Sequence, residues 1–108
     1  MFVIESPAPD QEPCLQLKGE FTIYAVAQAK RPLEAALDPG PELRLNLAGV
    51  EEIDTAGVQL LLWLKQESGR RGRTLALTAH SHAVVEAFDL LNVGTRFGDP
   101  ILLAPAAR

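Results

Sequence analysis

Cysteine, aromatic residues and positive charge are all scarce in this chain of 108 residues. Cys14 is the only cysteine, which excludes an intrachain disulfide and a cysteine-rich metal site. Lys and Arg number 10 against 14 Asp and Glu, giving a net charge of −4. A nucleic-acid-binding protein normally presents a basic face, so we expect no nucleic acid among the partners of this chain.

Long hydrophobic runs are missing as well. No segment approaches the roughly 18 to 20 uninterrupted apolar residues that a membrane helix needs, so we expect no direct membrane insertion. Residues 1–5 lack the basic region and the long apolar core of a secretory signal peptide. These absences predict a cytoplasmic location. No repeat or long linker divides the sequence, and we expect residues 1–108 to form a single domain.

Groupings of catalytic or metal-binding residues are also lacking. His80 and His82 are the only histidines, and near a predicted helix start they are expected to cap the helix or face solvent rather than bind a metal. The sequence contains no glycine-rich phosphate loop and no recognisable pairing of a nucleophile with a base. We therefore expect no catalytic residue, no metal site and no cofactor, and the chain is predicted not to be an enzyme.

The hydrophobic pattern changes period along the chain. Short apolar or alternating segments predict five β-strands, the second of which ends at Gly19: residues 2–4, 14–18, 43–47, 73–78 and 101–103. Helical periodicity predicts three helices: residues 22–37, 55 to about 69 or 72, and 81–91. Pro32 predicts a kink or break near Lys30 or Arg31. The order β-β-α-β-α-β-α-β predicts an α/β fold with a mostly parallel, four- to five-stranded sheet.

The junction between the third strand and the second helix is the candidate functional site. It begins with a short connection, residues 48–54, that carries three carboxylates: Glu51, Glu52 and Asp54. Asp54 or Thr55 can serve as the N-cap of the helix. Gly57 has no Cβ, so another backbone or a partner can approach closely. A phosphate on Thr55 would face free helix amides and add about −1.5 to −2 charge to an acidic rim.

Trp63 is a further candidate binding residue. It shares a helical stripe with Gln59, Gln66 and Arg70, which are polar, while neighbouring leucines account for the core. A tryptophan on a polar stripe can anchor a partner, because buried aromatic residues dominate binding hot spots. Partial burial against a neighbouring loop is the alternative, and the sequence leaves both open.

Several stretches together resemble a STAS domain, the fold shared by anti-sigma factor antagonists and the cytoplasmic tails of sulfate transporters. They are Gly-Glu-Phe-Thr at residues 19–22, the strand at 43–47, Val-Glu-Glu-Ile-Asp-Thr-Ala-Gly-Val at 50–58 and the strand–helix unit at 75–91. The resemblance covers nearly the whole chain. It implies a STAS fold and a bacterial signal-transduction protein that regulates transcription.

In antagonists of this family a cognate anti-sigma kinase phosphorylates a serine or threonine in this motif, and the phosphorylated form releases its partner. The resemblance places that hydroxyl at Thr55. It implies a regulatory protein-binding module whose partner is an anti-sigma factor with serine/threonine kinase activity or a histidine-kinase-type signalling protein. The implied partner-binding residues are Glu51, Glu52, Asp54, Thr55, Ala56, Gly57, Gln59 and Trp63.

Two features of the motif also resemble other STAS subgroups. Thr55 stands where many phosphorylated members have serine, and Ala56 replaces a second hydroxyl that some members carry. With the long leucine run, this version is similar to the small STAS subunit of phospholipid-transport ABC complexes, which packs on the ATPase through this helix. It is also similar to STAS adaptors of chemotaxis-type signalling systems. A constitutive subunit bound to a transport ATPase and a signalling adaptor therefore remain alternatives.

Overall fold

The structure is a computed structural model that describes residues 1–6, 14–38, 40 and 42–93. Its strands form one sheet in the order β1-β2-β3-β4. The strand bounds are β1 (Val3–Glu5), β2 (Cys14–Phe21), β3 (Glu42–Ile53) and β4 (Thr74–Thr78). β1 runs antiparallel to β2, and the other two pairs are parallel. The predicted α/β fold with a mostly parallel sheet is confirmed, while the strand predicted at 101–103 lies outside the described residues.

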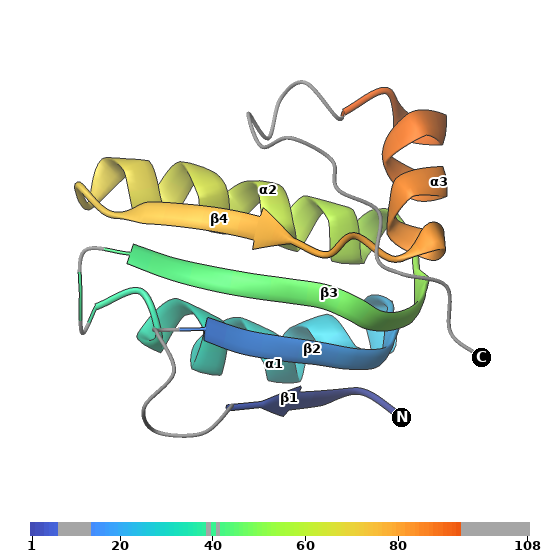
Figure 1. Cartoon of the computed structure of the whole chain (residues 1–108), viewed down its shortest axis with the longest axis horizontal. Helices are drawn as coiled ribbons and strands as arrows, with labels where there is room; N and C mark the ends of the chain where they lie inside the picture. Colours follow the sequence, from blue (N-terminus) through green and yellow to red (C-terminus); the bar gives the residue numbers. More distant parts are fainter. Residues whose placement is uncertain (7–13, 39, 41, 94–108) are drawn as a thin grey trace.

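Within the described residues, three helices accompany the sheet: α1 (Ile23–Ala35), α2 (Thr55–Arg70) and α3 (His82–Leu91). α1 and α2 are the crossovers between parallel strands, and they lie side by side on one face of the sheet (Figure 1). α3 lies beyond the carboxyl ends of β3 and β4. The starts of α1 and α2 and the end of β3 therefore meet at one edge of the molecule.

The hydrophobic core fills the space between the sheet and the helices. Alternate residues of β3 are buried, as the period of the strand requires: Leu43, Leu45 and Leu47. α1 contributes buried residues at four-residue intervals, which are Ala25, Ala29 and Leu33. Leu61 and Leu64 of α2 and Phe88 of α3 close the same core. The core thus fixes which face of each helix remains exposed at the edge.

Two strands are longer than the sequence predicts. β2 continues beyond Gly19, which adopts a φ of +94° beside an irregularity in the pairing with β3. A bulge of this kind bends a strand without ending it. β3 continues to Ile53, because the extended β2 still pairs with it there. Glu51 and Glu52 therefore lie in a strand, and the predicted connection over residues 48–54 shrinks to Asp54.

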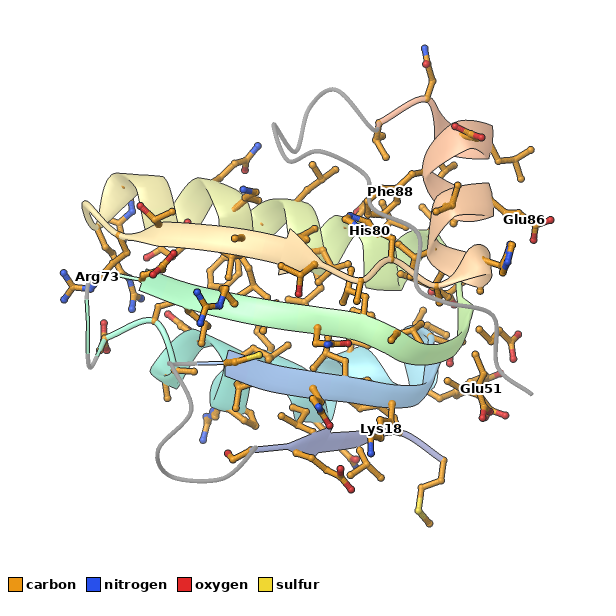
Figure 2. All side chains as sticks on the ribbon, viewed as in Figure 1. Lys18, Glu51, Arg73, His80, Glu86 and Phe88 are labelled. Atoms are coloured by element: carbon orange, nitrogen blue, oxygen red, sulfur yellow. The ribbon has the colours of Figure 1, made fainter. Side chains whose placement is uncertain are left out.

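Of the kink or break predicted near Lys30 or Arg31, the break is wrong, and the kink stays a prediction. Residues 23–35 form one helix with Pro32 inside it. Pro32 is exposed near the last turn, where the carbonyl that loses its amide partner, that of exposed Gln28, can be solvated. The expectation for His80 is also wrong, because its side chain is buried with its ring 6.0 Å from that of Phe88, edge to face (Figure 2).

The ends of α3 follow the prediction closely. Ser81 is the N-cap and its hydroxyl accepts a hydrogen bond from the amide of Val84. Asn92 ends the helix in the left-handed conformation, with a φ of 54°. Across the residues that the structure describes, no helix combines the length and the hydrophobicity of a membrane-spanning segment.

Candidate functional site

Asp54 joins the starts of two helices. Its Oδ1 accepts a hydrogen bond of 3.0 Å from the amide of Gly57 and so caps α2. Its Oδ2 accepts a bond of 2.9 Å from the amide of Ile23, the first residue of α1. The side chain of Thr22, the N-cap of α1, makes no capping hydrogen bond. The choice between Asp54 and Thr55 is therefore resolved in favour of Asp54, which holds two amides that lack an intrahelical acceptor.

Thr55 is the first residue of α2, and its side chain is exposed. Three further residues are exposed beside it: Glu51 and Glu52 at the end of β3, and Gln59 one helical turn along α2. These four residues, which we call the junction surface, lie at one edge of the molecule. Ala56 is half-buried, so it is less accessible than Thr55.

Gly57 allows the close approach of backbone that its position in the sequence suggested. It is buried, and a Cβ built on it would lie 2.9 Å from Cγ1 of Ile53 and closer still to the carbonyl oxygen of Phe21. The close approach at this position is therefore made by the end of β2 of the same chain. Gly57 lets α2 start directly against the sheet, which positions Thr55 at the edge.

Trp63 lies where α2 contacts α1. Its side chain is half-buried against the core, and Nζ of Lys30 lies 4.5 Å from the centre of its ring. A cation over an aromatic face is weakly attractive, by about 0.5 to 1 kcal/mol at an exposed site. The residue above the ring, Lys30, belongs to the helix α1, whereas the sequence analysis had considered burial against a loop as one alternative. The role of Trp63 as a partner anchor stays a prediction.

Two exposed apolar residues at this edge were missed by the sequence analysis. Ile23 is 61% exposed and Tyr24 is 91% exposed, both in the first turn of α1. The hydrogen bond between the amide of Ile23 and Asp54 places them next to the junction surface. The signal was present in the sequence, because the buried stripe of α1 at Ala25 and Ala29 leaves both side chains off the core.

Charged residues at the opposite ends of the same helices form a second cluster. Arg71 donates to Glu34 at 2.7 Å, to Asp38 at 2.8 Å and to Glu67 at 2.8 Å. Hydrogen bonds from Arg70 and then Arg71 lower the pKa of Glu67 from 4.5 to about 2. The cluster ties the end of α2 to the end of α1 and lies far from Thr55.

No metal centre is suggested by the described residues, which contain no group of three or more His, Cys, Asp or Glu side chains placed to hold an ion. The three carboxylates of the junction illustrate why. Glu51 and Glu52 are exposed at the end of β3 and supply only two carboxylates. Asp54 uses both of its oxygens on backbone amides.

The fold and the site together define a small α/β protein with an acidic strand–helix junction and an exposed hydroxyl at the start of the helix. A family model described as "Mlab, STAS domain" matches residues 4–104. The chain belongs to the STAS domain family. A comparison with curated proteins gave no match.

Solved structures of anti-sigma factor antagonists share this fold. SpoIIAA in its unphosphorylated form has a TM-score of 0.67 at 20% identity, over 94% of this chain and 88% of that one. SpoIIAA of Bacillus in the phosphorylated form has a TM-score of 0.64 at 19% identity, over 94% and 91%. An antagonist from Mycobacterium paratuberculosis has a TM-score of 0.69 at 16% identity, over 98% and 86%. Similarity at these identities concerns the fold.

Proposed function

We propose that this protein is a regulatory protein-binding module of the anti-sigma factor antagonist type, and not an enzyme. Its partner docks on the junction surface, with Tyr24 and Ile23 at the margin, and phosphorylation of Thr55 releases it. The observation that supports the proposal is that the side chain of Asp54, and not that of Thr55, caps α2. Asp54 caps α2, so the exposed hydroxyl of Thr55 is not needed as a cap.

A phosphate on Thr55 would leave the fold intact. It would stand at the positive end of the dipole of α2, where anions are favoured by about 0.3 to 1 kcal/mol near the surface. Asp54 engages the amide of Gly57, while the amides of Thr55 and Ala56 have no acceptor within the helix. These groups can hydrogen-bond a phosphate. The modified protein is therefore expected to remain folded.

The same phosphate would change the docking surface strongly. It adds about −1.5 to −2 charge beside Asp54, Glu51 and Glu52. A partner that buries this edge would have to desolvate a dianion among carboxylates, and it would also meet like-charge repulsion. The similarity to SpoIIAA, known in both unphosphorylated and phosphorylated forms, supports this switch.

The first test is mass analysis of the protein from its own cells, with peptide mapping over residues 51–65. A phosphate on Thr55 is expected under at least one growth condition. Binding of the co-purified partner is then compared for wild type, Thr55→Glu and Thr74→Glu. Thr74 is also exposed but lies at the start of β4, at the other end of the sheet, so it controls for added charge alone.

Thr55→Glu is expected to weaken partner binding about tenfold or more, since one buried like charge easily costs the ~1.4 kcal/mol that corresponds to tenfold. Thr74→Glu is expected to leave binding within about twofold, because charges beyond a Debye length are screened. Equal binding by wild type and the enzymatically phosphorylated protein would refute the switch. The phosphorylated protein is the decisive sample, because glutamate carries less charge than a phosphate.

A second candidate is a constitutive STAS subunit of a phospholipid-transport ABC complex. The description of the matching family model, which names Mlab, supports it. In that case Thr55 would contribute packing at a permanent interface with an ATPase. Unmodified Thr55 across growth conditions, together with a transport ATPase that co-purifies stably, would favour this candidate over the switch.

A further inference from the structure

An acidic groove runs between the end of β3 and α3, next to the junction surface. It has a volume of about 740 Å³ and is lined by Glu51, Glu52, Ile53, Ala83, Glu86, Ala87, Asp89 and Leu90. Figure 2 shows Glu51 and Glu86 at the same end of the molecule, opposite Arg73. We call this feature the α3 groove.

The spacing of residues on α3 produces this shape. Val84 and Phe88 are buried in the core, which turns Ala83 and Ala87 toward β3. A methyl group fills little of the space beside the helix, so a hollow remains above Ile53. Leu90 comes one turn after Glu86 on the same side and stands at the rim, 87% exposed. A large apolar side chain is thus left in water beside an apolar floor.

The charged side chains that line the α3 groove are all acidic. Four of its eight lining residues are carboxylates, and no Lys or Arg of the described residues lines it. None of the four carboxylates forms an ion pair with a described Lys or Arg. The carboxylates at the opposite end of the helices differ in this respect, since Glu34, Asp38 and Glu67 are all paired with Arg71. Uncompensated charge around apolar surface favours a cationic occupant.

We propose that the α3 groove binds a basic amphipathic segment of the partner protein. An apolar side chain of that segment packs on Ile53, Ala83 and Ala87 and covers Leu90, while flanking Lys or Arg side chains face the four carboxylates. A second copy of this chain fits poorly, because its net charge is −4. The inference deepens the proposed function, since Glu51 and Glu52 belong to both surfaces.

The test uses the full chain and two synthetic helical peptides of about 14 residues, roughly four turns. One carries leucines on one face with flanking lysines, and the other replaces every lysine with glutamate. The lysine peptide is expected to shift the NMR amide signals of α3 and of the end of β3, with an affinity that falls as salt rises. The glutamate peptide is expected to leave these signals unchanged.

Variants of α3 then locate the contact. Leu90→Ser is expected to weaken binding of the lysine peptide about tenfold, because the peptide would no longer bury the apolar side chain of Leu90. Glu86→Lys is expected to weaken it at least about fivefold by charge reversal. Glu42→Lys is the matched control, with an effect below about twofold, since Glu42 is exposed at the far end of β3.

Three results would overturn the proposal. Equal binding of both peptides would show that charge plays no part. A nuclear Overhauser contact between Leu90 and residues 101–103 in the free protein would show that the chain fills its own groove. Dimerisation that Leu90→Ser abolishes would identify a second copy as the occupant. None of these results concerns Thr55, so failure here is distinct from failure of the phosphorylation switch.

Discussion

The double capping by Asp54 gives the sharpest test of how the junction is built. Asp54→Ala removes the acceptors for Gly57 at the start of α2 and for Ile23 at the start of α1. Loss of an N-cap costs about 1 kcal/mol, within a range of about 0.5 to 2. Loss of one further hydrogen bond costs about 0.5 to 1.5 kcal/mol. The free energy of unfolding is therefore expected to fall by about 1 to 3.5 kcal/mol, with about 2 kcal/mol as the central value.

Asp54→Asn separates the two contributions. Asparagine caps a helix about as well as aspartate, so the bond from Gly57 to the side-chain oxygen is retained. The amide nitrogen that replaces Oδ2 cannot accept from the amide of Ile23. Only the second contribution is lost, and the expected cost is about 1 kcal/mol.

The assay is equilibrium unfolding in urea, with Ser81→Ala as the control. Ser81 caps a single helix through one bond to Val84, so its replacement measures the cost of one cap in this fold. Asp54→Ala is expected to be clearly more destabilising than Ser81→Ala. If Asp54→Ala costs no more than Ser81→Ala, and Asp54→Asn unfolds like the wild type, the bridge between the two helices contributes nothing and the reasoning is refuted.

The remaining predictions concern Gly57 and Glu67. Gly57→Ala is expected to destabilise the fold by more than about 2 kcal/mol, because the added methyl overlaps the carbonyl of Phe21. In the same helix, the methyl added by Gly69→Ala meets nothing within 4 Å, so this variant is expected to stabilise the fold by about 0.5 to 1 kcal/mol. Urea unfolding compares the two variants, and changes in stability of the same sign would contradict the packing argument. The pKa of Glu67 is lowered to about 2 in the folded protein, so its stabilising effect relative to Glu67→Gln is complete above pH 4.5 and disappears as the pH falls toward 2. A difference in stability between wild type and Glu67→Gln that does not change between pH 5 and pH 2.5, by unfolding at each pH, would contradict this assignment.

The sequence predicts most of the fold because its periodicity is clear. Alternating residues in β3 and β4 and the capped start of α3 at Ser81 follow rules that act within a few residues. The errors arise where the contact is distant in the sequence. Gly19 ends a strand by local rules, but pairing of β2 with the end of β3 carries both strands further. Pro32 breaks a helix by local rules, but an exposed site near the helix end tolerates it.

The candidate site was predicted in part for the same reason. The sequence predicted a cap at Asp54 or Thr55 and a close approach at Gly57. The choice of Asp54, and the carbonyl of Phe21 that approaches Gly57, are visible only in the folded chain. The second bond of Asp54, to the amide of Ile23, joins residues 31 apart, so only the folded chain brings Tyr24 to this edge. The α3 groove depends likewise on the packing of α3 against β3.

The helices α1 and α2 are tied together at both ends, by Asp54 where they begin and by Arg71 where they finish. Because these contacts join α1 and α2 at each end, the two helices resist sliding and separating. The edge formed by the starts of the helices therefore keeps its shape in the free protein. A partner that docks there does not have to order the backbone, and this saves part of the entropy cost of association. Recognition at this edge is therefore expected to be of the lock-and-key kind, with rates set by diffusion and charge.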